Sequence, residues 1–308
     1  MLLTYFSPFY FIYPVLCLGA FFGLYFGLKN AGKKTQYWVL FGITLFNFAL
    51  HFLKLAFPPY VQDLPASVRE VAFENICAVS TLVFPLLFLS KKPVLLDYMF
   101  YIGVVSGIAS MFAPMNIIGL NVYDFETIRF YICHGSLWTV PLLMVIFGLH
   151  KLDYHRIWKM PFLYYMCLLI ILFNEVILNV TGWVGDGTME SFLSTEYRNS
   201  AFIFGPPANM EGVAQFLLVL TPSFFKPGKY IDFYMPILWE VIPVYIYGTI
   251  YMLALSAIWE HAHMAQDWRN LTKKAAIKFR RHKIKNYKRS KYTPPKRRYG
   301  NAKRYKCK

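Results

Sequence analysis

The stretch VAFENICAVSTLVFPLLFLS, residues 71–90, decides how this chain is built. As a helix, a mainly apolar run of about 20 residues is long enough to cross the roughly 30 Å hydrocarbon core of a bilayer. Its first part carries Glu74, Asn75 and Cys77. Ionisable groups in a membrane are costly unless they are paired or face a cavity. These residues therefore mark a candidate functional site.

The rest of the chain has the composition of a polytopic membrane protein, being 57% hydrophobic and 19% aromatic over 308 residues. Apolar runs of roughly 20 residues predict seven membrane-spanning helices. They cover residues 9–28, 37–57, 71–90, 94–112, 128–149, 160–180 and 234–257. We therefore predict an all-α, seven-helix transmembrane bundle over residues 1–260, with a long loop at 181–233.

The basic residues of the short loops predict the orientation, because cytoplasmic loops carry an excess of Lys and Arg. They follow the first, third and fifth runs, and they are Lys29, Lys33, Lys34, Lys91, Lys92, Lys151, Arg156 and Lys159. This pattern predicts an outer N-terminus and a cytoplasmic C-terminus, and we expect the protein in the cell membrane. The 181–233 loop would lie outside, either as a cover folded back over the bundle or as a loosely ordered insertion.

Residues 261–308 form a basic tail that holds 18 of the 32 Lys and Arg residues but one acidic residue, Asp267. Such a segment is expected to bind the anionic cytoplasmic leaflet of the membrane. Contact with nucleic acid or the ribosome is the less favoured alternative, since Tyr and Phe alternate with the charges.

Polar residues on five predicted spans fall at one depth, about 8–11 Å below the outer boundary when counted at about 1.5 Å per residue. They are His51, Cys77, His134, Glu175 and Glu240. A cysteine in an apolar helix is ordinarily a small buried hydrophobe, and we interpret Cys17, Cys133 and Cys167 in this way. Scattered structural residues would not readily share one layer.

A thiol becomes a nucleophile when a nearby imidazole takes its proton, and a carboxylate often orients that imidazole. We therefore predict Cys77 and His134 as a catalytic pair, with Glu175 or Glu240 as the orienting group. Glu74, Asn75 and His51 complete the supporting polar layer, although Asn75 lies on a different helical face from Cys77. No HxxxH or CxxC spacing indicates a metal site, and we predict no cofactor.

Two other classes of function fit the same residues. A proton-coupled transporter or ligand-binding bundle would use the layer as a relay, although no internal repeat typical of many transporters is evident. A scaffold recruited through the tail would not need the layer.

Short motifs along the chain also resemble a known family. They are NIC at 75–77, CHG at 133–135, NEVILNVTGW at 174–183, NSAFIFGPP at 199–207 and PILWE at 236–240. In this order they resemble the seven-helix membrane proteins that group bacterial YwaF-type proteins with human transmembrane protein 164. The resemblance covers roughly residues 35–258. It implies an enzyme that transfers or hydrolyses fatty acyl chains of phospholipids and lysophospholipids, with the family's cysteine at Cys77 and its histidine at His134.

Overall fold

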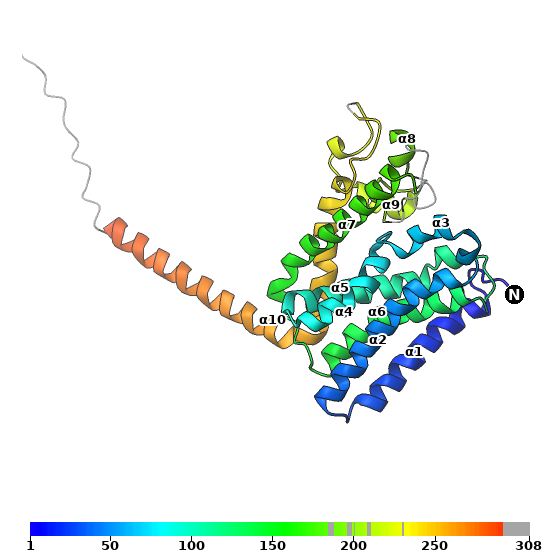
Figure 1. The fold of residues 1–308 in the computed structure, drawn as a ribbon. Helices are drawn as coiled ribbons and strands as arrows, with labels where there is room; N and C mark the ends of the chain where they lie inside the picture. Colours follow the sequence, from blue (N-terminus) through cyan, green and yellow to red (C-terminus); the bar gives the residue numbers. More distant parts are fainter. Residues whose placement is uncertain (184–187, 196–198, 200, 208–210, 230, 292–308) are drawn as a thin grey trace, which may run out of the picture. The chain divides into compact units, whose positions relative to one another are not determined.

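A computed structural model describes residues 1–308 apart from 184–187, 196–198, 200, 208–210, 230 and 292–308. The chain divides into two compact units, Met1–Trp259 and Glu260–Lys308. Helices account for the regular structure of the described residues, and the only β-type pairing among them is one bridge between Leu2 and Asn121. The all-α prediction is therefore confirmed (Figure 1).

In the part of the chain that the structure describes, seven longer helices correspond to the seven apolar runs. They are α1 (Pro8–Leu28), α2 (Lys33–Leu53), α4 (Ile76–Ser90), α5 (Pro93–Phe112), α6 (Phe125–Ile146), α7 (Met160–Val180) and α10 (Leu238–Lys291). All except α4 are long and apolar enough to cross a membrane, giving six candidate spans among the described residues where the sequence predicted seven.

Helix α4 is shorter than its apolar run because its first residues do not join the helix. Asn75 is the N-cap, and its side-chain oxygen accepts a hydrogen bond from the Ala78 amide at 2.9 Å. An Asn at this position satisfies one of the amides that a helix start leaves free. The resulting 15 residues extend for about 22 Å at 1.5 Å each. Glu74 and Asn75 thus precede the helix instead of lying within it, contrary to prediction.

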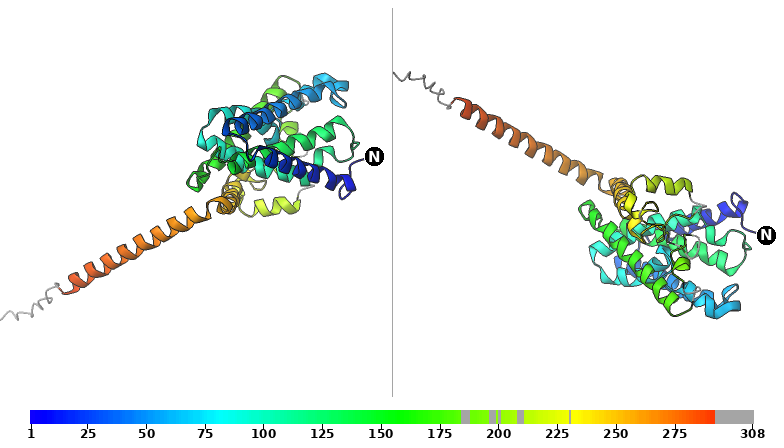
Figure 2. Two further views of the ribbon diagram at one scale, coloured as in Figure 1. Left: turned by 90° about the horizontal axis from the view of Figure 1, so that it is seen from below. Right: turned by 90° about the horizontal axis from the view of Figure 1, so that it is seen from above.

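The core of the first unit is a pair of closely packed helices, α5 and α6, flanked by α2 and α4 (Figures 1 and 2). Gly103 on α5 permits this approach, since a Cβ there would lie 2.6 Å from the Leu137 carbonyl oxygen on α6. Small residues have this role where helices pack in lipid. Helix α1 joins through Tyr13, whose ring stacks on Tyr131 of α6.

The first part of α10 is fixed to α5 and α7 by hydrogen bonds from tyrosines. The Tyr251 hydroxyl donates to the Tyr101 carbonyl at 3.3 Å, and the Tyr165 hydroxyl donates to the Val241 carbonyl. The Trp259 ring packs edge-on against Phe100 at a centroid separation of 5.2 Å. These contacts place the last apolar segment against the helical core.

The 181–233 segment contains short helices, α8 (Met189–Phe192) and α9 (Glu211–Leu218), and a 3₁₀ turn, η7 (Ser223–Phe225). Asn199 organises one stretch of it by donating to the Gly205 carbonyl at 2.5 Å and accepting from the Phe204 amide at 3.0 Å. The Trp239 indole then donates to the Phe202 carbonyl at 2.8 Å. The stretch around Phe202 is thus packed on the start of α10.

In the second unit, the described part of the predicted tail belongs to α10, which ends at Lys291. Its large apolar side chains are exposed, among them Trp268, Leu271 and Phe279. The rest of the tail, residues 292–308, lies outside the described residues.

Candidate functional site

A cavity of about 690 Å³ opens among the end of α2, the start of α4, the end of α5 and the start of α6. Ala201 and Phe202 of the 181–233 segment also line it. Five residues singled out in the sequence are part of its wall: His51, Glu74, Asn75, Cys77 and His134. Glu175 and Glu240 are both buried, at 3% exposure, but are not among the lining residues.

Cys77 is the second residue of α4, so its thiol belongs to the first helical turn. The first amides of an α-helix have no acceptor within the helix, and this end of the helix dipole favours negative charge. A cysteine at a helix N-terminus is one of the recognised settings of a reactive thiol. The Sγ atom lies 3.4 Å from the Ser110 hydroxyl of α5. Ser110 therefore holds the half-buried thiol at the cavity wall.

His134 lies on α6, and its Nδ1 is 2.8 Å from the Phe130 carbonyl oxygen. Because a carbonyl oxygen only accepts hydrogen bonds, this contact assigns the proton of the neutral ring to Nδ1. Nε2 is then the basic nitrogen. The Phe130 ring also packs against the imidazole at a centroid separation of 4.0 Å. The orienting group in the structure is thus a backbone carbonyl one helical turn earlier.

His51 is held in a different way. Its Nε2 lies 3.1 Å from the Val71 carbonyl oxygen, so it donates to the backbone just before Glu74. The ring is 4% exposed. This contact ties the end of α2 to the segment that leads into α4, and it gives His51 a positioning role at the cavity.

A buried ion pair lies beside the imidazole. Arg129 Nε donates to Glu126 at 2.7 Å and Arg129 Nη2 at 2.5 Å, so the guanidinium binds the carboxylate through two hydrogen bonds. The Tyr60 hydroxyl is hydrogen-bonded to the same carboxylate, and burial together with the negative charge of Glu126 raises the pKa of Tyr60. The charge of Arg129 is therefore balanced within this group.

A second charged group lines the cavity before α4. Glu74 is hydrogen-bonded to Glu70 and accepts from Asn75 Nδ2 at 3.1 Å. Burial, followed by the nearby Glu70 carboxylate, raises the pKa of Glu74 to about 8. Two cations, Lys54 and Arg69, also line the wall. Lys54 is 3% exposed, with Nζ 5.0 Å from the centre of the Tyr60 ring.

The sequence analysis did not identify five of these residues, because they lie in loops or near helix ends. They are Lys54, Tyr60, Arg69, Glu126 and Arg129. The Glu126 and Arg129 pair had a usable signal, since residues three apart at the start of an apolar run lie on one helical face. Lys54, Tyr60 and Arg69 had none, because the loop between α2 and α4 brings them back to the cavity. Within the described part of the chain, the cavity's His, Cys and acidic residues form no group of three suited to a metal ion.

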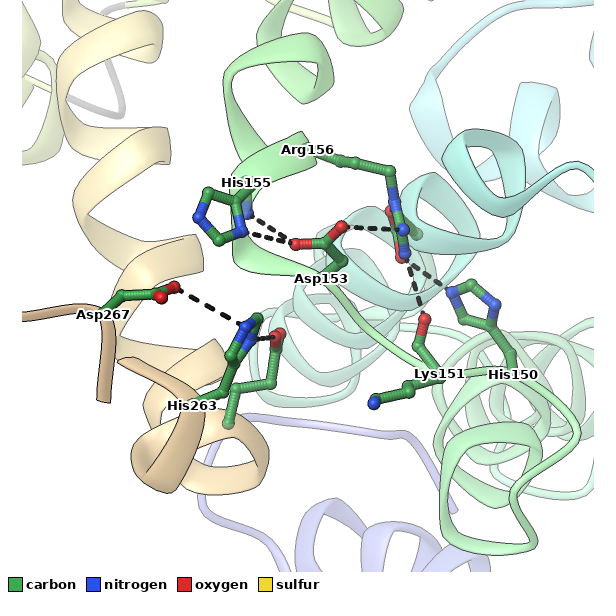
Figure 3. Close-up of polar contacts among 9 residues, drawn as sticks. His150, Lys151, Asp153, His155, Arg156, His263 and Asp267 are labelled. Carbon is green, nitrogen blue, oxygen red and sulfur yellow. Dashed lines mark hydrogen bonds and ion pairs between the residues drawn. The ribbon is translucent and has the colours of Figure 1, made fainter. Parts of the chain in front are cut away.

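A separate polar cluster lies near the opposite end of α5 from Ser110. Asp97 has no exposed surface. Its Oδ1 accepts hydrogen bonds from His150 Nε2 at 2.7 Å and from Arg156 Nη2 at 3.0 Å. Arg156 Nη1 also contacts Asp153 at 3.1 Å, and Asp153 accepts from the His155 ring at 2.9 Å (Figure 3). This network fixes the connection between α6 and α7 and has no member in the cavity wall.

A family model described as the TMEM164 family matches residues 5–226, well over half of the chain. The chain belongs to the TMEM164 family. This finding confirms the resemblance to transmembrane protein 164. Together with the six apolar helices of spanning length in the described part of the chain, it makes this TMEM164-family protein a multi-pass integral membrane protein. No curated protein and no solved structure matches the chain. The matched region includes both Cys77 and His134.

Proposed function

We propose that this TMEM164-family protein transfers or hydrolyses fatty acyl chains of phospholipids and lysophospholipids through Cys77 and His134. The observation that carries the proposal is one cavity lined by both a thiol in the first turn of a helix and a histidine whose Nδ1 is fixed by a backbone carbonyl. Acyl transfer uses this combination of nucleophile and base.

In the first half-reaction, Nε2 of His134 takes the thiol proton and Cys77 Sγ attacks the ester carbonyl carbon. The C–S bond forms, the C–O bond to the glycerol oxygen breaks, and that oxygen receives the proton from Nε2. The negative charge on the carbonyl oxygen is stabilised by the Ile76 and Cys77 amides of the first turn of α4, because Asn75 already accepts from the Ala78 amide. The products are a lysophospholipid and a thioester on Cys77.

In the second half-reaction, the hydroxyl of an acceptor lysophospholipid gives its proton to Nε2 and its oxygen attacks the thioester. The C–S bond breaks, and the thiolate regains the proton. Water in place of the acceptor gives hydrolysis. Exclusion of water from the site therefore decides between transfer and hydrolysis, and the packed stretch around Phe202, which lines the cavity, is suited to this role.

An acyl-exchange assay tests the proposal. Purified protein in nanodiscs receives an isotope-labelled phospholipid and a lysophospholipid, and mass spectrometry follows the label. Cys77→Ala and His134→Ala should each abolish exchange. Cys17→Ala is the matched control, since its thiol interacts with the Tyr131 carbonyl on α6 and does not line the cavity. Absence of exchange in every variant with several lipid classes would overturn the acyl proposal and favour the alternative of a proton-coupled transporter or ligand-binding bundle.

The proposed setting is the cell membrane, with α4 as a seventh crossing, the N-terminus outside and the tail in the cytoplasm. The distribution of Lys and Arg among the loops supports this orientation. The basic helix that continues α10 then binds anionic lipids, with nucleic acid or ribosome contact as the less favoured partner. Reporter fusions at the two termini test the orientation, because only an odd number of crossings puts the termini on opposite sides.

A further inference from the structure

Two cations in the cavity wall, Lys54 and Arg69, are not neutralised in the way that Arg129 is. Arg129 is bound by both oxygens of Glu126. Neither Lys54 nor Arg69 forms a hydrogen bond or ion pair within the part of the chain that the structure describes, and Arg69 Nε is buried with no partner. A buried donor left unpaired costs free energy. The wall therefore holds donors that suit a bound acceptor.

The acidic residues beside them supply less charge than their number suggests. The Glu70 and Glu74 carboxyl groups are joined by a hydrogen bond, and two carboxyls in such contact favour sharing one proton and one negative charge. The raised pKa of Glu74 agrees with this arrangement. Against this single negative charge stand Lys54 and Arg69. The group carries one net positive charge, which favours an anionic ligand.

The chemistry of these two donors fits a phosphate group. Lys provides a compact point charge, and Arg provides planar donors that match the oxygens of phosphate. Both residues line the same 690 Å³ cavity as Cys77. In a glycerophospholipid, the phosphate and the acyl ester are only a few bonds apart, so one cavity can hold both.

We propose that Lys54 and Arg69 bind the phosphate group of the lipid whose acyl ester faces Cys77. This inference rests on the proposed function for the identity of the lipid as an acyl substrate. It makes the two cations specificity-determining residues that favour phospholipids and lysophospholipids over neutral acylglycerols of the same chain length. Lys54 is buried, and its Nζ lies close to the ring of Tyr60.

The test measures binding without chemistry, using the full-length chain with Cys77→Ala in nanodiscs. The probes are a photoreactive lysophosphatidylcholine and a monoacylglycerol with the same photoreactive chain, and mass spectrometry quantifies saturable labelling. We expect the lysophospholipid to reach half-saturation at an about 10-fold lower mole fraction, the size of effect given by one charge-assisted contact. Lys54→Met should remove this preference, Lys54→Arg should keep it, and Arg69→Gln should reduce it.

Lys92→Met is the matched control, since Lys92 is an exposed lysine outside the cavity wall, and it should keep the preference. Equal labelling by the two probes would overturn the inference. A Lys54→Met substitution that lowers the labelling by both probes to the same extent would also overturn it. The bound phosphate could belong to a lipid headgroup or be free phosphate, and labelling in the presence of inorganic phosphate distinguishes the two. Labelling that persists in its presence assigns the site to lipid phosphate, whereas its complete loss assigns the site to free phosphate and overturns the lipid assignment.

The two proposals fail in different ways. If the Cys77→Ala chain shows no preference for the lysophospholipid, the phosphate-site proposal is refuted and the acyl-transfer proposal still stands. If the lysophospholipid is preferred but the unsubstituted protein never forms a thioester on Cys77, the phosphate site is supported and the acyl-transfer proposal is refuted.

Discussion

Gly107 of α5 lies directly against the His134 carbonyl of α6, so closely that a Cβ at Gly107 would be 2.7 Å from that oxygen. The Trp138 amide nitrogen would be 3.1 Å away. Because Gly107 has no side chain, the turn of α6 that carries His134 can pack directly against α5.

Gly107→Ala should consequently damage both stability and the site, because the contacting atoms are backbone and cannot rotate away. Overpacking of this kind costs about 1–3 kcal/mol. We expect a lower Tm in detergent and reduced reactivity at Cys77. Gly23→Ala is the control, since a Cβ there would meet no atom within 4 Å. An unchanged Tm for Gly107→Ala would contradict the packing described.

Asn75→Ala should weaken the start of α4, because it removes the acceptor of the Ala78 amide. Loss of such a cap typically costs about 1 kcal/mol. Asn75→Asp retains an acceptor and should keep most of the stability. Thermal unfolding gives the Tm, and labelling with a maleimide reports whether Cys77 is still held. Equal Tm values for the alanine and aspartate variants would argue against the capping role.

Asp97→Ala should destabilise the first unit strongly. The substitution leaves Arg156 and His150 without the carboxylate that both contact. Breaking a buried ion pair by removing one partner costs about 3–5 kcal/mol. Asp153→Asn changes the more exposed carboxylate of the same network and should cost no more than about 1 kcal/mol. Similar Tm losses for the two variants would contradict the central place of Asp97.

The raised pKa of Glu74 predicts a stability that falls as pH rises. The folded protein holds a proton on Glu74 up to about pH 8, whereas the reference value is 4.5. Between these values the folded state binds more protons than the unfolded state, so the free energy of unfolding decreases with pH. The contribution is complete below about pH 4.5 and is lost as pH rises through about 8.

Glu74→Gln should therefore flatten the pH dependence of Tm over this range, because Gln keeps the shape without the titration. Asp63→Asn, an exposed acidic residue outside the cavity wall, is the control and should leave the slope unchanged. A Tm of the unsubstituted protein that rises from pH 5 to pH 8, with the slope lost in Glu74→Gln, would show the opposite sign.

The sequence predicted the helices well because apolar runs of spanning length leave few alternatives in a membrane. It misplaced the start of α4, since Glu74 and Asn75 were counted as part of a continuous run. Asn75 carried a signal for the correct boundary, because Asn is a preferred N-cap. His51, Cys77 and His134 could be brought together by counting residues from the predicted boundaries.

Other parts of the site needed three-dimensional information. Depth along a helix does not give rotation around it, so counting could not show that Glu175 and Glu240 fall outside the cavity wall. The Phe130 carbonyl is a backbone group with no signature in the sequence. Lys54 and Arg69 reach the cavity through a loop whose course depends on packing. Outside the cavity, the contact of Asp97 with Arg156 joins residues 59 positions apart and likewise depends on packing.

Intact-protein mass spectrometry after incubation with a phospholipid of one defined acyl chain tests whether Cys77 is the nucleophile. We expect a mass increase equal to that acyl group, located on Cys77 by proteolysis and released by neutral hydroxylamine. Cys77→Ala should carry no such group, and His134→Ala should form it far more slowly. A chain that remains unmodified at Cys77, or that carries an equal adduct after Cys77→Ala, would show that Cys77 is not the acyl-accepting nucleophile.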